Sequence, residues 1–186
     1  QEALAKANQA LEHPMEILTS GDWNENSAYI QALADQVLQA LAGYADRKVP
    51  VIFSAHSLPV AHIANGDTYE QQLQGTLQAI LRKTGPLEHY LAYQSKGGGQ
   101  GDWLGPEVEE ILDMLASHGK TQVLLVPFGF TCDHIETLYD IDTAIAGHAR
   151  NLGIALTRTM ALNCDPGFIR ALAGVAAEVM EREVVG

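Results

Sequence analysis

Cysteine is scarce in this sequence, because Cys132 and Cys164 are the only two among 186 residues. A small disulfide-bonded scaffold needs more thiols than this, so we expect the chain in a reducing compartment, the cytoplasm. An iron–sulfur cluster usually takes four cysteine ligands, so no cluster of that kind is expected.

Basic residues are also few. Lys and Arg number 11 against 23 Asp and Glu, and the formal net charge is −12. A surface that binds nucleic acid needs clustered Lys and Arg to contact phosphates, and no such cluster occurs, so nucleic acid is excluded as a partner. The same charge offers no attraction to anionic lipid headgroups. It suits a solvated surface that weakly attracts cations.

Long apolar runs are missing as well. No stretch could span a bilayer, so any association with a membrane is at most peripheral, and no signal peptide is visible. Hydrophobic residues nevertheless make up 47% of the chain, which predicts a packed globular domain. The sequence opens at Gln1 without an initiator Met, in a stretch with helical character, so we expect it to be part of a longer protein.

Short apolar runs alternate with amphipathic stretches along the chain. Four runs predict strands, at residues 49–54, 88–94, 122–128 and 155–161. Apolar residues spaced three and four apart predict helices before the first strand and after the first and second strands. A further helix is expected over residues 133–151, and a last one from Asp165 and Pro166, which form a cap-plus-proline signal.

This alternation predicts an α/β fold with a four-stranded parallel sheet and helices on both faces. In such sheets, ligands bind beyond the carboxyl ends of the strands. The segments to search for a site are therefore those that follow the strands, at residues 54–59, 94–105, 129–140 and 163–166.

Nucleotide-binding and hydrolase motifs are absent. The glycine cluster at 97–101 does not fit G-x-G-x-x-G and is interpreted as a loop. The Gly119-Lys120-Thr121 triplet lacks the first glycine of a P-loop and precedes a strand where a P-loop would open a helix. Ser54 is not framed by the glycines of a nucleophile elbow, which argues against a serine hydrolase.

Potential metal ligands gather after the first and third strands. His56 and Glu136 stand at these two strand ends, and neutral imidazole is both a metal ligand and a proton acceptor. Asp133, Glu136 and Asp140 would share one face of a helix, and oxygen ligands with an imidazole suit a loosely held divalent metal. The alternative is that Asp133 caps the helix and the carboxylates favour its N-terminus. The residues alone leave both readings open, and His134 is interpreted as a structural hydrogen-bonding residue.

A series of motifs resembles the ferrochelatases, in family order and with family spacing, from about Trp23 onward. Asp133-His134-Ile135-Glu136-Thr137-Leu138-Tyr139 is the most specific of them. The others lie at residues 53–59 (FSAHSLP), 66–69 (GDTY), 93–96 (YQSK), 103–106 (WLGP), 125–128 (LVPF) and 162–166 (LNCDP). The resemblance divides the chain into an N-terminal helical and linker segment at 1–26, from the region between two lobes, and the C-terminal ferrochelatase lobe at 27–186.

The resemblance implies a flavodoxin-like lobe of the class II chelatase fold and a lyase that inserts Fe²⁺ into protoporphyrin IX or coproporphyrin III in heme biosynthesis. His56 and Glu136 would be catalytic residues and, with Asp140, would handle the metal. Ser54, Trp103 and Tyr139 would support the porphyrin. Iron is then a substrate, and neither an organic cofactor nor an iron–sulfur cluster is expected. The partners would be porphyrin, ferrous iron and the second, N-terminal lobe.

Three departures from the family pattern leave alternatives open. Ala144 stands one turn past Asp140, where the family usually has an acidic residue, and Asp142 is a candidate substitute. The glycine cluster before Trp103 differs from the family, and the N-terminal lobe is missing. The alternatives are a cobalt or sirohydrochlorin chelatase of the related smaller type, and a metal-binding fragment without catalytic activity.

Overall fold

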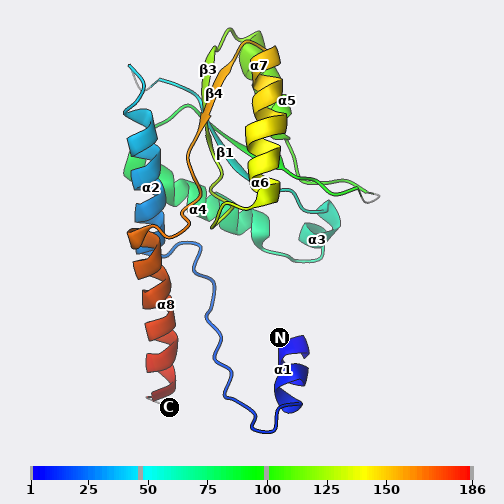
Figure 1. The fold of residues 1–186 in the computed structure, drawn as a ribbon, viewed down its shortest axis with the longest axis vertical. Helices are drawn as coiled ribbons and strands as arrows, with labels where there is room; N and C mark the ends of the chain where they lie inside the picture. Colours follow the sequence, from blue (N-terminus) through cyan, green and yellow to red (C-terminus); the bar gives the residue numbers. More distant parts are fainter. Residues whose placement is uncertain (1, 46–47, 99–100, 185–186) are drawn as a thin grey trace.

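The chain folds around a four-stranded parallel sheet in the order β2-β1-β3-β4 (Figure 1). The computed structural model describes residues 2–45, 48–98 and 101–184, without the side chains of residues 2, 136 and 182–184. The strands are β1 (Val51–His56), β2 (His89–Gln94), β3 (Gln122–Val126) and β4 (Ala155–Arg158).

Helices cover both faces of the sheet, as the alternating sequence pattern predicts. The bounds are α1 (Glu2–Gln9), α2 (Ser27–Leu41), α3 (Val60–Ala64), α4 (Tyr69–Thr84), α5 (Val108–Ser117), α6 (Ile135–Tyr139), η1 (Asp140–Ile145), α7 (Ala146–Asn151) and α8 (Pro166–Val184). Within the described ranges, no helix is both long and apolar enough to cross a membrane.

The hydrophobic core has two parts, one on each side of the sheet. Successive residues of a strand point to opposite faces. In β1, Phe53 therefore packs with residues of α2, α4 and the start of α8, whereas Ile52 packs with α5, η1 and α7. Phe53 also meets Phe128 edge to face at 5.7 Å between ring centroids. The predicted fold class is thereby confirmed.

The observed elements differ from the predicted ones at their ends. β1 runs two residues further than predicted and includes His56, and β4 ends at Arg158. The helix predicted over 133–151 begins at Ile135 and widens into the π-helical turn η1. Hydrophobic periodicity does not reveal such a turn, because one short π-helical turn shifts the spacing between successive apolar residues by less than one sequence position. Of the glycine cluster at 97–101, residues 99–100 lie outside the described part.

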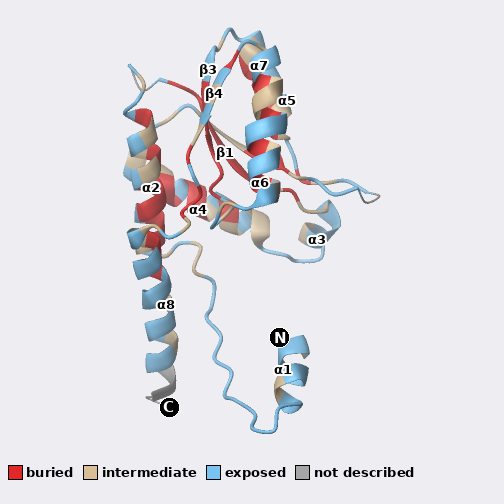
Figure 2. Cartoon of the chain, viewed as in Figure 1, coloured by how far each residue is buried: buried red, intermediate tan, exposed pale blue. Residues whose placement is uncertain are grey.

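The two end segments project away from the sheet (Figure 1). The far half of α8 is exposed on nearly all sides, and so are α1 and the stretch that links it to α2 (Figure 2). Several of these exposed residues are large and apolar. They include Leu4, Met15 and Met180, and Ile169 and Leu172 in the first half of α8 are exposed as well.

Helix α2 begins at a well-formed cap. The side-chain oxygen of Asn26 accepts hydrogen bonds from the backbone N–H groups of Ala28 at 3.0 Å and Tyr29 at 3.2 Å. These groups have no partner within the helix, so the cap satisfies donors at the start of the most buried helix.

We predict that Asn26→Ala lowers the free energy of unfolding by about 1 kcal/mol, because both N–H groups lose their acceptor. Asn26→Asp keeps a cap oxygen and serves as the matched control. Urea unfolding followed by circular dichroism measures both variants, and equal midpoints for Asn26→Ala and the unchanged chain would contradict this role.

Candidate functional site

The strand order identifies one edge of the sheet as the place for a ligand site. β1 lies between β2 and β3, so the chain moves to opposite sides of β1 in its two crossovers. In open parallel sheets, ligands bind at the carboxyl ends of the strands where this reversal occurs. His56 ends β1, and the segment that carries Glu136 follows β3, so both predicted residues belong to the reversal point. The side chain of Glu136 itself is outside the described part.

A hydrogen bond at Nδ1 orients the ring of His56. Nδ1 lies 2.6 Å from the carbonyl oxygen of Ser57. A carbonyl oxygen only accepts, so Nδ1 carries the proton and Nε2 carries the lone pair of the neutral ring. Nε2 is therefore the atom with the character of a base and of a metal ligand.

A second group of hydrogen bonds holds the backbone around His56. The hydroxyl of Tyr69 donates to the carbonyl oxygen of His56 at 3.0 Å, and Ser57 Oγ donates to the carbonyl oxygen of Leu104 at 2.8 Å. Burial raises the pKa of Tyr69 to about 12, so its hydroxyl stays a donor at neutral pH. The Ser57 N–H donates to the carbonyl oxygen of Gln94 at 2.8 Å, which ties β1 to the end of β2.

The loop after β3 crosses the end of β1 at close range. A Cβ at Gly129 would lie 2.6 Å from Ala55 Cβ, and the Gly129 N–H donates to the carbonyl oxygen of Ser54 at 3.1 Å. Only glycine lets two backbones approach this closely without displacing one of them. This contact directs residues 130–134 past the end of the strand that carries His56.

Asp133 joins the segments that follow β3 and β4 through its side chain. It accepts hydrogen bonds from Asn163 Nδ2 at 2.7 Å and Arg158 Nη1 at 3.3 Å, and its side chain is 10% exposed. The helix begins two residues later, at Ile135. The interpretation of Asp133 as the helix cap is therefore wrong, and its hydrogen bonds brace the segments that follow β3 and β4. Metal binding by Asp133 stays a prediction.

Arg158 also forms an ion pair with Asp142. Its Nε and Nη2 donate to the two carboxylate oxygens of Asp142 at 2.6 and 2.8 Å, a bidentate pair. This hydrogen-bonded partner holds the pKa of Asp142 below its ordinary value. Asp142 is therefore not available as a substitute for the acidic residue that is missing at Ala144.

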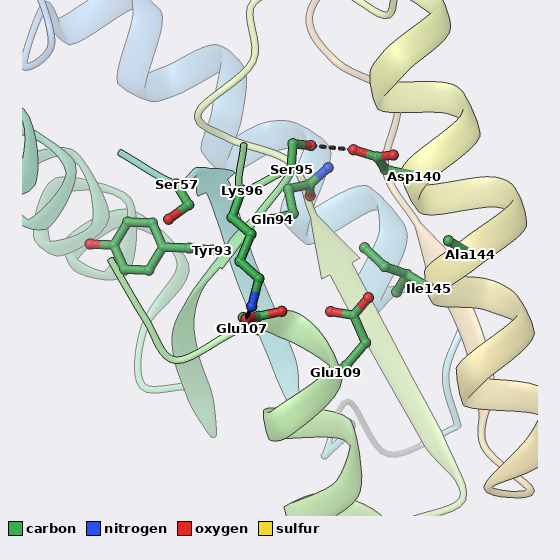
Figure 3. A pocket seen from close by; sticks show the side chains of 10 residues that line it. All are labelled: Ser57, Tyr93, Gln94, Ser95, Lys96, Glu107, Glu109, Asp140, Ala144 and Ile145. Atoms are coloured by element: carbon green, nitrogen blue, oxygen red, sulfur yellow. Dashed lines mark hydrogen bonds and ion pairs between the residues drawn. The ribbon is translucent and has the colours of Figure 1, made fainter. Parts of the chain in front are cut away.

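Asp140 lies in a pocket at the end of β2, with a volume of about 200 Å³ (Figure 3). Its carboxylate accepts a hydrogen bond from Ser95 Oγ. Ser95 has a φ of 58°, a left-handed conformation that costs a non-glycine residue energy and often marks functional sites. Ala144 lines the same pocket from η1, and Glu109 lines it from α5.

Three further predicted residues occupy different environments. Ser54 is fully buried, and its Oγ makes no hydrogen bond within the described part, so it does not face an open cleft. Trp103 is half-buried, and its ring covers Gly97 so closely that a Cβ there would come within 2.8 Å. Tyr139 is 62% exposed on α6. Direct contact of a ligand with Trp103 and Tyr139 stays a prediction.

Exposed apolar side chains occur in the segments that follow β1, β3 and β4. Ile135 is 87% exposed, and Leu138 and Tyr139 extend the same apolar surface along α6. Val60 of α3 and Met160 after β4 are also exposed and follow other strands at this edge. An apolar rim beside an imidazole suits a flat, largely hydrophobic ligand with a polar centre.

Direct multidentate binding of a metal is not preformed in the described part of the chain. No three His, Cys, Asp or Glu side chains there are arranged to hold one ion.

Sequence reasoning missed Tyr69, Gln94 and Glu109 as site residues. Gln94 and Ser95 fall in a segment marked for search, but nothing in their spacing shows which groups they meet. Glu109 stands in the first turn of α5, where an acidic residue is expected for the helix N-terminus alone. His134, by contrast, hydrogen-bonds Thr137 Oγ1 at 2.7 Å, which confirms its structural role.

Known proteins resemble this chain in sequence and in fold. The family profile described as Ferrochelatase matches residues 1–180. A protein named Ferrochelatase from Geotalea daltonii is 40% identical over 157 residues, which cover 83% of this chain and 49% of that protein. Another with this name, from Herpetosiphon aurantiacus, is 39% identical over 175 residues and covers 92% and 57%. The chain thus spans about half the length of these relatives.

The structural similarity extends to a more distant protein. SirB from Bacillus subtilis, whose structure was solved with Fe³⁺, matches 96% of this chain and 63% of its own chain, with a TM-score of 0.66. The two sequences are only 11% identical, so this likeness establishes the shared chelatase-type fold and nothing more.

We predict that Asp142→Asn destabilises the chain modestly near pH 7 and progressively less as the pH falls below the ordinary pKa of the carboxyl, about 3.8. The pKa of Asp142 is depressed in the folded chain, so the pair with Arg158 adds stability above that pH and loses it as the pH falls further. The loss is modest because Asp142 is 48% exposed and water screens the pair.

Urea unfolding at pH 7 and at pH 3 measures this difference. Asp22→Asn removes an exposed carboxylate far from Arg158 and is the matched control. An Asp142→Asn deficit that is as large at pH 3 as at pH 7 would show that the effect is not electrostatic.

Proposed function

The chain belongs to the ferrochelatase family, and on this basis we propose that it is one lobe of an enzyme that inserts Fe²⁺ into a porphyrin in heme biosynthesis. The observation that carries the proposal is the anchored imidazole of His56, whose Nε2 has the lone pair and which stands at the reversal point of the sheet. Protoporphyrin IX or coproporphyrin III is the proposed substrate, and the scarcity of cysteine favours the cytoplasm.

Two obstacles define the chemistry of the reaction. Two pyrrole N–H protons must leave the macrocycle, and Nε2 of His56 is the group that would accept a proton. Hydrated Fe²⁺ must also lose water, and stepwise replacement by imidazole and carboxylate ligands lowers that barrier. His56, Glu136 and Asp140 would supply these ligands, with iron as the substrate and no organic cofactor or iron–sulfur cluster.

The apolar rim supports a porphyrin as the ligand. Ile135, Leu138 and Tyr139 expose apolar surface on the helix that carries Glu136, and Val60 does so on α3. A macrocycle laid across this edge would cover these side chains and bring its centre over His56. Exclusion of water there would also strengthen the electrostatic interactions of the imidazole with the metal.

The other wall of the cleft would come from the second lobe. The chain matches only about half of each of these relatives, and the exposed apolar residues on α8 and in the first 20 residues form surfaces that a second lobe could cover. Ile169, Leu172 and Met180 on α8 belong to this surface. We propose that the N-terminal lobe of the complete protein packs there.

We predict that a chimera of this chain behind the N-terminal half of the Geotalea daltonii relative inserts Zn²⁺ or anaerobic Fe²⁺ into a dicarboxylate porphyrin. His56→Ala in the same chimera is expected to lose at least about a hundredfold in rate, because the proton acceptor is gone. The visible spectrum of the porphyrin follows the reaction. His62→Ala is the control, since His62 lies on α3 and not at the end of β1.

The result would decide the role of His56. Equal turnover of the chimera with and without His56 would remove this residue from the mechanism. A folded chimera that binds porphyrin but inserts no metal would contradict the proposal that this lobe carries the insertion chemistry.

We predict that Glu136→Gln lowers turnover strongly in the same assay, by about tenfold or more, because the variant keeps the shape of the side chain but not its charge. Circular dichroism serves to show that α6 still forms. An unchanged rate would support the alternative that this carboxylate only favours the N-terminus of the helix.

A further inference from the structure

The two cysteines of this chain lie in segments that meet at the carboxyl edge of the sheet. Cys132 is in the loop between β3 and α6, and Cys164 is in the turn between β4 and α8. Both thiols are exposed and free in the structure. Although the two residues are far apart in the sequence, the fold brings their segments together.

Direct hydrogen bonds join the residues beside the two thiols. The Asn163 N–H donates to the carbonyl oxygen of Thr131 at 2.9 Å. The Asp133 N–H donates to Asn163 Oδ1 at 2.8 Å, and Asn163 Nδ2 donates to Asp133 Oδ2 at 2.7 Å. Asn163 thus binds the residues on both sides of Cys132, and Cys164 is the residue that follows Asn163.

A tight turn keeps Cys164 beside this contact. The Asp165 N–H donates to the carbonyl oxygen of Leu162 at 2.8 Å, so Asn163 and Cys164 form the tip of the turn. Because each cysteine directly follows one end of the hydrogen bond between Asn163 and its partner, their Cα atoms lie within about 10 Å of each other. A movement of a few ångströms in the exposed turn reaches the Cα separation of a disulfide, about 4.4–6.8 Å.

We propose that Cys132 and Cys164 form a reversible disulfide when the chain meets a small disulfide such as oxidised glutathione. Both thiols are exposed, so the oxidant has access to them. They are the only two cysteines among the 186 residues, so no other internal pairing competes. In the reducing compartment proposed for this chain, disulfides are usually transient and respond to the redox state.

Thiol–disulfide exchange in two steps gives this product. The thiolate of one cysteine attacks a sulfur of oxidised glutathione, which forms a mixed disulfide and releases one glutathione thiolate. The thiolate of the other cysteine then attacks the protein sulfur of the mixed disulfide and releases the second glutathione. Two electrons pass from the cysteines to glutathione, and the two cysteine protons end on the two glutathione thiols.

The crosslink would restrain the entrance to α6. It joins the loop that leads into α6 to the turn that leads into α8, and α6 carries Glu136. Oxidation would therefore restrict the segment that holds the proposed iron-handling carboxylate. This consequence rests on the proposed function, whereas the disulfide itself needs neither porphyrin nor iron. Its failure to form is therefore distinguishable from failure of the proposed function.

Equilibration of this chain with mixtures of reduced and oxidised glutathione tests the proposal. We expect an oxidised monomer that has lost the mass of two hydrogen atoms. Digestion without reductant should yield a peptide that joins Cys132 to Cys164, and dithiothreitol should restore both thiols. Cys132→Ser and Cys164→Ser should each form only a mixed disulfide with glutathione.

A relocated thiol provides the matched control. Cys132→Ser combined with Ser117→Cys keeps two exposed thiols, but Ser117 ends α5 just before the amino end of β3. Cys164 follows the carboxyl end of β4, so these two thiols lie at opposite edges of the parallel sheet. This variant should form two mixed disulfides and no internal crosslink.

The melting temperature provides a second measurement. Oxidation should raise it by about 5 °C or more in the unchanged chain, because a crosslink that closes a loop of roughly 30 residues restricts the unfolded state. Cys132→Ser should show no such rise in the same buffer. A fall in the melting temperature of the crosslinked chain would show that the fold must open to form the disulfide, and would overturn the proposal.

Three further results would also overturn it. The first is two glutathione adducts on the unchanged chain with no internal crosslink, which would show that the thiols do not meet. The second is a disulfide that forms only between two chains. The third is an equal yield of internal disulfide in the Ser117→Cys control, which would show that pairing does not depend on the contact between the two loops.

Discussion

The parallel pairing of β1 with both β2 and β3 is the constraint on which the rest of the site depends. Because the three strands run in one direction, their carboxyl ends share one edge, and the loops that follow them meet there. His56 ends the central strand of the three, and hydrogen bonds hold both its ring, at the Ser57 carbonyl, and its backbone carbonyl, at the Tyr69 hydroxyl. The metal-handling chemistry proposed for the chain needs this convergence, since its residues come from segments about 80 positions apart.

Polar contacts between loops make this edge specific. Asp133 and Asn163 bind each other across the loops after β3 and β4, and Arg158 joins Asp133 to Asp142. These hydrogen bonds occupy the carboxylates of Asp133 and Asp142, which would otherwise be available to bind a cation. Asp140 lies in its pocket with Ser95 as its hydrogen-bond partner. The position of Arg158 thus determines that Asp133 and Asp142 are paired with a cation and that Asp140 is not paired with Arg158.

Much of the fold could be predicted because strand and helix periodicities are local. The run 122–128 and the stripe of α5 marked a buried strand and its covering helix, and the structure places both as expected. The ends of the elements were harder to predict, since β1 extends to His56 and the helix after β3 begins at Ile135. The π-helical turn that begins at Asp140 rotates the following residues away from the helix face that regular α-helical spacing would give them. The turn spans too few residues to be detected from hydrophobic periodicity.

The sequence by itself determined the α/β architecture, the family, and the placement of His56 and Glu136 near the ends of the first and third strands, whereas the structure showed that these two strands are neighbours. These features depend on short-range periodicity and on motifs whose residues are contiguous. Only the tertiary structure decided that Ser54 is buried, that Asp142 is paired with Arg158, and that Glu109 faces Asp140 across a pocket. The physical reason is that a polar group's partner is set by which distant segments meet, and spacing along one chain does not encode that distance in space.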